Sequence, residues 1–352
     1  MTLGILVRSK PAVLAYSEKG QINQAVEMAK NAKIFGIKIK IIDFEDFRNF
    51  GKIKKTTDII HDKCYSQRKE EKIIFKNFHK KCKKEGLPIF NDYGLIRVVG
   101  NKWKLNEFLK DKESIKECVV PTFFYDKKKI RKLLKTYGTL ILKPIWGQEG
   151  TGVIEIKKNN GFFLASYKKR EGGEFKIKTE KLKNLQDIES VILELWRNNN
   201  YIIQPKINSA KFENNVFDIR LTLQKMKDWE IGGIGARVAG KGSFLCNIAA
   251  GGEMFNGEYA IGKVFPQKKD NIIKKIESTA IEIGEFLEKE VDGIVAEIGF
   301  DFMIDEKGRA WLLEINSKPS PEIFYKKELE KMRRKMTFWP ILFAKYYYGN
   351  KK

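Results

Sequence analysis

The chain has 352 residues, of which 42% are hydrophobic and 32% charged, and its 68 Lys and Arg against 45 Asp and Glu give a formal net charge of +23. This length allows two or three domains with hydrophobic cores, and the composition excludes a disordered chain. Two histidines and four scattered cysteines without a Cys-x-x-Cys pair argue against structural zinc and against histidine-based hydrolysis. We expect free thiols in a reducing compartment.

Location and charge lead to further expectations. No apolar run approaches the roughly 20 residues of a membrane-spanning helix, and the start lacks the pattern of a signal peptide, so we expect a cytoplasmic protein.

The positive surplus predicts attraction to polyanions such as an acidic peptide, or else reflects lysine bias on solvated helix faces. No recognition motif supports nucleic acid beyond the charge itself. His79 lies among lysines in a helical stretch, and we expect it to be solvated.

The first hundred residues read as a small Rossmann-like unit. Residues 3–7 form an apolar strand, and residues 22–29 carry apolar side chains at helical spacing. A strand is predicted over 37–41, a helix over 70–85 and a further strand over 88–91. The first strand is not followed by Gly-x-Gly-x-x-Gly, so we do not predict a dinucleotide site there.

The next hundred residues mix helices and strands around a glycine-rich turn. Asp126 is a plausible N-cap for a helix that Gly138 ends. We predict helices over 102–110, 126–137 and 188–196, and strands over 139–143, 153–156, 162–167 and 174–179.

The last block is rich in strands. We predict strands over 201–204, 216–225 and 230–238, a long amphipathic helix over about 272–287, a hairpin of 296–304 with 309–316, and a final helix over about 322–348. In that last helix Trp339, Leu342, Phe343 and Tyr346 fall at helical spacing, and we expect them to pack onto the protein rather than onto a membrane.

The first chemical pattern is a strand that ends in Lys143 and runs into a loop with Gly147, Gly150 and Gly152. Glycines let backbone N–H groups approach phosphate oxygens closely, and a lysine at the strand end can neutralise phosphate charge. A strand rather than a helix follows, so this is not a P-loop. By itself the pattern also fits a plain glycine hairpin.

The second pattern lies in the predicted hairpin. Glu314 and Asn316 are two residues apart and project from one strand face, and Asp301 lies on the partner strand. Three converging oxygen ligands suit Mg²⁺, with nucleotide phosphates completing its coordination. A polar outer sheet face is the alternative, and it fits poorly because the neighbouring residues are strongly apolar.

The third pattern is a pair of charged strands. Asp218 and Arg220 share one strand face, and Arg237 on the next strand can join them. Two arginines suit a forked grip on phosphate or carboxylate. A single Asp–Arg pair across the strands, without any ligand, is the alternative.

The order of these motifs resembles the ATP-grasp superfamily, and in particular the endospore coat-associated YheC/YheD-like family. The resemblance covers about residues 90–324 and rests on Phe217-Asp218-Ile219-Arg220, on Asn247 with Gly251-Gly252, and on Leu313-Glu314-Ile315-Asn316-Ser317-Lys318-Pro319. It departs from the pattern at Glu149 in the glycine loop and at Asn101, where an aspartate is common.

The resemblance implies an α/β (α+β) ATP-grasp fold that binds ATP and Mg²⁺. It implies a Rossmann-like pre-ATP-grasp domain over 1–100, a small lid over 101–200 and a large ATP-grasp domain over 201–352. Phosphate contacts are implied for Lys102, Lys143 and the loop of Gly147, Gly150 and Gly152, and an adenine hinge for Gln204, Pro205, Lys206 and Ile207. Asp218 joins the nucleotide site, Asp301, Glu314 and Asn316 hold Mg²⁺, and Arg220, Arg237 and Asn247 face the γ-phosphate and an acyl phosphate.

The activity implied is an ATP-dependent carboxylate–amine ligase that forms an amide through an acyl phosphate on a peptide or protein substrate. Association with the developing spore coat is implied as well. Two alternatives remain open: a phosphotransferase on the same scaffold, and a non-catalytic basic coat or binding protein with a vestigial ATP site.

Overall fold

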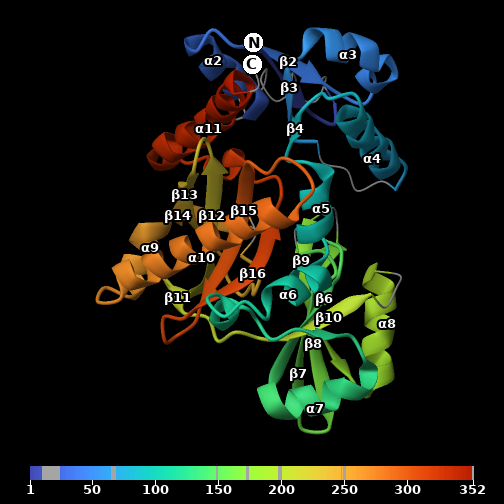
Figure 1. Cartoon of the computed structure of the whole chain (residues 1–352). Coiled ribbons are helices and arrows are strands. Elements are labelled where there is room, and N and C mark those ends of the chain that lie inside the picture. The colour runs from blue at the N-terminus through green and yellow to red at the C-terminus, as the bar shows by residue number, and fades with distance from the viewer. Residues whose placement is uncertain are drawn as a thin grey trace.

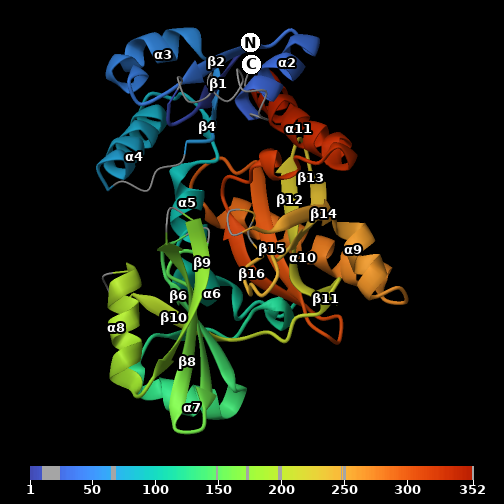
Figure 2. The same cartoon turned by 180° about the vertical axis from the view of Figure 1, so that it is seen from behind.

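The structure is a computed structural model that describes residues 1–9, 24–64, 69–147, 150–171, 174–196, 200–246, 248 and 251–350. It contains three β-sheets (Figure 1). The N-terminal sheet lies at one end of the molecule and the lid sheet at the other. The third sheet, which carries the largest hydrophobic core, lies between them. Figure 2 shows the same arrangement from behind, with the lid sheet facing the viewer.

The N-terminal sheet is parallel, with strand order β2-β1-β3-β4. Apolar side chains cover both of its faces, as burial between helices requires. This confirms the Rossmann-like arrangement expected for the first block. The elements are β1 (Thr2–Leu6), α2 (Gln24–Ile34), β2 (Lys38–Ile42), α3 (Phe50–Thr56), β3 (Ile59–Asp62), α4 (Lys69–Lys84), β4 (Ile89–Phe90) and α5 (Tyr93–Val99).

The lid sheet is antiparallel, with strand order β5-β10-β6-β7-β8-β9. Two helices pack on one of its faces through a separate hydrophobic core. The other face is turned towards the large domain. The elements are α6 (Lys102–Leu109), β5 (Phe123–Phe124), α7 (Lys127–Tyr137), β6 (Thr139–Pro144), β7 (Ile154–Asn159), β8 (Phe162–Glu171), β9 (Glu174–Leu182), α8 (Leu185–Trp196) and β10 (Tyr201–Pro205).

The large domain is built on an antiparallel sheet with order β14-β13-β12-β15-β16, and β11 pairs with β12. The predicted hairpin of β15 and β16 is present. Helix α10 packs on the large sheet through its apolar face. The elements are β11 (Lys211–Phe212), β12 (Asn215–Lys225), β13 (Trp229–Val238), β14 (Glu253–Asn256), α9 (Gly257–Val264), α10 (Lys269–Glu290), β15 (Glu297–Ile304), β16 (Ala310–Asn316) and α11 (Glu330–Gly349).

Two elements lie close to the predicted domain limits. β10 pairs with β5 and β6, so the lid sheet continues to Pro205. Leu105 and Leu109 of α6 are buried in the core of the large domain rather than in that of the lid. The limits at 100 and 200 remain predictions. Each of these two elements lies on one side of a predicted limit and packs with the domain on the other side.

The C-terminal helix packs onto the protein, but through a different stripe from the one we expected. α11 begins at Glu330, and Ile341, Phe343 and Ala344 are buried against the N-terminal sheet. Tyr346, which we placed on the buried stripe, is 42% exposed. The expectation was wrong for this residue because α11 packs against α2, β12 and β13 through the neighbouring face, which carries Ile341 and Ala344. No helix among the described residues is long and apolar enough to cross a membrane.

His79 also differs from expectation, because it is 2% exposed rather than solvated. It lies on the inner face of α4 with Phe75 and Cys82, and its Nε2 lies 3.1 Å from a carboxylate oxygen of Asp62. The surrounding lysines occupy the outer face of the helix, and their number concealed the apolar stripe that carries the histidine.

Candidate functional site

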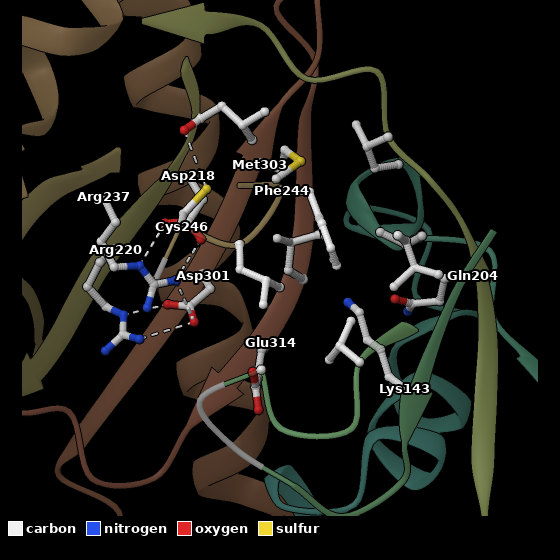
Figure 3. A pocket seen from close by; sticks show the side chains of 18 of the residues that line it. Lys143, Gln204, Asp218, Arg220, Arg237, Phe244, Cys246, Asp301, Met303 and Glu314 are labelled. Carbon is white, nitrogen blue, oxygen red and sulfur yellow. Dashed lines mark hydrogen bonds and ion pairs between the residues drawn. The ribbon is translucent and has the colours of Figure 1, made fainter. Parts of the chain in front are cut away.

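A cavity of about 780 Å³ lies between the lid sheet and the large sheet. It brings together side chains from β6, β10, β12, β13, β15 and β16, which are far apart in the sequence (Figure 3). The predicted site residues that line it are Lys102, Lys143, Gly147, Gly150, Gln204, Pro205, Lys206, Ile207, Asp218, Arg220, Arg237, Asp301, Glu314 and Asn316.

Two predicted site residues are not among those lining the cavity. Gly152 lies behind the glycine loop, where its carbonyl accepts a hydrogen bond from the Tyr201 hydroxyl at 2.9 Å. Its φ of +75° and its contact with Pro144 leave no room for a side chain, so glycine is required there for the shape of the turn. Asn247 lies outside the described residues, as do Gln148 and Glu149 of the loop.

Lys143 enters the cavity from the lid side. It is near the end of β6, paired in register with Ile202, and Figure 3 shows it beside Gln204 and across the cavity from the arginines. Burial lowers the pKa of its ammonium group to about 8, although Glu314 acts to raise the pKa. Among the described residues, none pairs with this ammonium by an ion pair or hydrogen bond. A partly buried cation without such a partner favours an anionic ligand.

Lys102 connects the glycine loop to the hairpin. Its Nζ donates to the carbonyl of Gly147 at 2.8 Å and lies 3.2 Å from Oε1 of Glu314. The residue begins α6, and the side chain of Asn101 caps that helix by accepting from the N–H of Lys104. Asparagine and aspartate both serve as N-caps, so the departure at position 101 preserves the helix start.

Two arginines and two aspartates form a buried square on the opposite side (Figure 3). Arg237 is bidentate to Asp218 through Nε and Nη2, with both distances 2.7 Å. The same Nη2 also lies 3.0 Å from Oδ2 of Asp301. Arg220 is bidentate to Asp301 through Nε and a terminal nitrogen. Burial acts to raise the pKa of Asp301, but Arg220 and Arg237 hold it below its usual value. Burial raises the pKa of Asp218, although Arg237 acts to lower it. The predicted strand-face grouping is therefore present.

The three predicted metal ligands lie together at the end of the hairpin. Asp301 is in register with Glu314, and Asn316 Nδ2 is 3.4 Å from Oδ2 of Asp301. Among the described residues, no group of three or more His, Cys, Asp or Glu is placed to hold a metal. Two carboxylates with an amide oxygen nevertheless match the donor set of Mg²⁺, which takes one or two protein carboxylates and completes its shell with phosphates and water. The residues present therefore fit Mg²⁺.

The predicted hinge follows β10. Gln204 donates from Nε2 to Thr122 at 2.8 Å, and the backbone N–H of Lys206 donates to the carbonyl of Thr139 at 3.0 Å. Lys206 also pairs through Nζ with Glu155 at 2.5 Å. The N–H of Lys206 is thus used within the lid, and a bound base would take its backbone hydrogen bonds from the other hinge groups.

Several lining residues were not predicted as site residues. Met303 lies two positions after Asp301 on β15, so the strand alternation that selected Asp301 also indicated Met303. Lys318 stood within the Leu313–Pro319 motif, but nothing in the sequence gave it a role. Burial raises the pKa of the Cys246 thiol, which is therefore not a reactive thiolate. The other unpredicted residues include Val120, Phe244, Leu245, Ile248, Leu313, Ser320 and Ile323.

The lid sheet and the large sheet enclose the cavity between them, and the comparison with known families identifies this arrangement. Residues 87–347 match the family described as YheC/D like ATP-grasp, and this chain belongs to that family. The protein described as endospore coat-associated protein YheD of Bacillus subtilis (strain 168) is 24% identical over 282 residues. That match covers 78% of this chain but only 59% of YheD.

Solved structures confirm the ATP-grasp fold. D-alanine–D-alanine ligase from Bacillus anthracis, solved in complex with ATP, aligns over 100% of both chains with a TM-score of 0.58 and 11% identity. A RiPP-associated ATP-grasp ligase from Chryseobacterium gregarium, solved with ADP and a leader and core peptide, aligns over 97% of both chains with a TM-score of 0.56 and 10% identity. At these identities the likeness is one of fold.

Proposed function

We propose that this protein binds MgATP in the cavity and uses it to join a carboxylate to an amine. The observation that carries the proposal is the position of Lys143, a partly buried cation that, among the described residues, has no ion-pair partner and lies across the cavity from Glu314. A phosphate chain between them would satisfy the lysine on one side, and Mg²⁺ held by Glu314, Asn316 and Asp301 would neutralise it on the other.

The charges around the cavity support this ligand. Six of the described lining residues are cationic and three are anionic. Lys206 is paired with Glu155 and Lys318 with Asp62, and neither carboxylate lines the cavity. The other lining side chains, four cationic and three anionic, leave an excess of one positive charge, to which Mg²⁺ would add two, and this excess favours a polyanion such as ATP. The cationic residues are Lys102, Lys143, Lys206, Arg220, Arg237 and Lys318, and the anionic ones are Asp218, Asp301 and Glu314.

The proposed chemistry requires positioning and charge neutralisation. A carboxylate oxygen attacks the γ-phosphorus, the bond to the β–γ bridging oxygen breaks, and ADP leaves with that electron pair. An amine then attacks the acyl phosphate carbon, loses a proton and expels phosphate, which gives an amide. The proposal assigns Arg220 and Arg237 to the charge that develops on the transferred group, and Mg²⁺ would supply electrostatic stabilisation of the phosphates. No histidine or serine nucleophile is needed.

We further propose a peptide or protein as the carrier of the carboxylate or the amine, in the cytoplasm or at the developing spore coat. Two comparisons support this part: the similar ligase fold was solved with leader and core peptides, and YheD is described as endospore coat-associated. The positive charge of the chain favours an acidic peptide over a basic one.

The test is to incubate the protein with MgATP, pools of amino acids and acidic peptides, and to measure ADP and phosphate while products are identified by mass spectrometry. A ligase gives free phosphate and an amide in equal amounts. Lys143→Met should abolish this turnover, whereas Lys157→Met, which changes an exposed lysine on β7 of the same sheet, should leave it unchanged. A phosphorylated acceptor would identify a kinase instead, and failure to bind nucleotide would identify a vestigial site.

A further inference from the structure

The loop that follows the predicted metal ligands is held by the N-terminal domain. Three consecutive residues directly after Asn316 each contact a different residue of that domain. Asn91 donates from Nδ2 to the carbonyl of Ser317 at 2.5 Å, and Lys63 donates from Nζ to the carbonyl of Pro319 at 2.6 Å. The ammonium of Lys318 between them forms an ion pair with Asp62 at 2.8 Å. We call residues 317–319 the clamped loop.

The ammonium of Lys318 is directed at the N-terminal domain. Besides its pair with Asp62, it donates to the backbone carbonyl of Cys64 and lies 4.3 Å from the centroid of the Phe75 ring. These three contacts all come from the N-terminal domain. The side chain of Lys318 nevertheless lines the cavity. It therefore connects the cavity wall to the N-terminal domain rather than reaching into the cavity with its charge.

The anchoring carboxylate is itself fixed. Asp62 is 1% exposed, accepts from the backbone N–H of Cys64 at 2.9 Å through Oδ1, and contacts His79 at 3.1 Å through Oδ2. It stands at the end of β3, in the centre of the parallel sheet. Asp62 therefore offers Lys318 an immobile partner.

The same contacts reach the strand that carries Asp301. Lys63 also pairs with Glu297 at 2.7 Å, and the side chain of Asn91 bonds the backbone of Glu297 in both directions. Close packing joins the two segments, because a Cβ added to Gly299 would lie 3.0 Å from Cβ of Pro319. Both strands of the metal hairpin are thus held at this end by the N-terminal domain.

Asn316 needs this support, since its own side chain is loosely held. Within the part of the chain that the structure describes, its one side-chain hydrogen bond, to Asp301, is 3.4 Å long, and it is the last residue of β16. A strand end frays unless neighbouring contacts fix it. The position of the Asn316 amide oxygen is therefore set by the backbone of the clamped loop.

We propose that Lys318 is a positioning residue through which the N-terminal domain fixes the metal end of the cavity. The proposal rests on the function proposed above. It predicts that loosening Lys318 weakens the contribution of Mg²⁺ to nucleotide binding and leaves the contribution of the base and sugar in place. Residues that orient metal ligands from outside typically change metal affinity by 10–100-fold, so we expect a shift of about tenfold.

The test uses Lys318→Met, which keeps the apolar stem but removes the charge, and Lys318→Arg, which keeps charge and reach. ADP binding is measured by calorimetry across a range of Mg²⁺ concentrations and also without metal. Lys318→Met should raise the Mg²⁺ concentration for half-maximal binding about tenfold, while metal-free affinity changes less than twofold. In Lys318→Arg the Mg²⁺ concentration for half-maximal binding should return most of the way to the wild-type value. Asp62→Asn provides a second variant with the same expected shift if Lys318→Met does not fold.

The matched control is Glu27→Gln. Glu27 of α2 pairs with Arg333 of α11 at 3.1 Å, a second link between the N-terminal domain and the rest of the chain that is not part of the cavity wall. It should lower the melting temperature without moving the Mg²⁺ midpoint. An equal shift in Glu27→Gln, an unchanged midpoint in Lys318→Met, or an equal loss of metal-free binding would each overturn the inference. A wild-type protein that binds no ADP at any Mg²⁺ concentration would instead refute the proposed function.

Discussion

Lys102 and Glu314 form an ion pair, with 3.2 Å between Nζ and Oε1, that ties the start of α6 to the end of the metal hairpin. The lysine also holds the carbonyl of Gly147, so one ammonium group joins the loop and the carboxylate. In the proposed function, a Mg²⁺ ion at Glu314 would compete with this lysine for Oε1. Metal binding would then be linked to the position of the glycine loop through Lys102.

Glu314→Gln should nearly abolish ATP turnover while leaving the fold intact. The change removes one anionic ligand and the partner of Lys102, where charge must be neutralised in the transition state. The expected loss in kcat is on the order of 10²–10³. ADP release measures it, and circular dichroism checks the fold. Glu306→Gln, in the exposed turn of the same hairpin, is the control, and ADP production at the wild-type rate by Glu314→Gln would disprove the metal assignment.

Nucleotide binding should weaken above about pH 8. Burial lowers the pKa of Lys143 to about 8 in the free protein, and the charged form is the one that attracts phosphate. Bound phosphate raises this pKa, so affinity for ATP is constant below pH 8 and falls above it by up to tenfold per pH unit. Calorimetry from pH 7 to 9.5 measures this fall. Lys143→Arg should bind with no such dependence, since arginine stays charged throughout.

Glu297→Gln should destabilise the protein at neutral pH. Glu297 is 1% exposed and is paired with Lys63 and His61, so its loss leaves a buried charge uncompensated, at a cost of about 3–5 kcal/mol. Burial opposes its ionisation, but Lys63 and His61 lower the pKa of Glu297 to about 2. The stabilisation is therefore complete above the unfolded pKa near 4.5 and lost as the pH falls towards 2.

Urea unfolding at pH 7 and at pH 3 provides the measurement for Glu297→Gln. The difference from the wild type should be largest at pH 7 and smaller at pH 3. Glu306→Gln again serves as the exposed control and should change stability by less than about 0.5 kcal/mol. Equal costs at both pH values would show that the lost charge is not the cause.

Truncation after Met336 should lower the melting temperature. It removes Ile341 and Phe343, whose burial contributes roughly 1.5–3 kcal/mol each. A loss of this size corresponds to about 2–4 °C for each kcal/mol. Tyr346→Ser, which changes an exposed residue of the same helix, should melt like the wild type. If the truncated chain melts unchanged but no longer sediments with anionic vesicles, the helix serves a membrane surface instead.

The sequence predicted most elements of the fold because their patterns are local. The β15–β16 hairpin follows from two alternating apolar runs around the turn at Asp305–Gly308, and the Asp218–Arg237 pairing follows from strand faces. The His79 prediction failed although a signal was present: Phe75, His79 and Cys82 are spaced as one buried helix face. The many lysines around the histidine concealed this spacing.

The clamped loop could not have been predicted from the sequence. Asn91 and Ser317 are separated by 226 positions, and only the tertiary fold brings them within a hydrogen bond. The two-point pairing of Arg220 with Asp301 and of Arg237 with Asp218 was likewise hidden, because strand faces indicate which residues meet but not how many bonds each one forms. Local periodicity thus predicts elements and faces, whereas the number and partners of long-range polar contacts depend on packing.

The packing of α11 on the N-terminal sheet has a consequence for the order of folding. Leu3 and Ile5 of β1 share a core with Ile341 and Ala344, so part of this face of the sheet is covered by a helix far along the chain. Contacts of this sequence separation form slowly, because a long loop must close first. On the ribosome, this part of the face therefore stays uncovered until α11 has been synthesised.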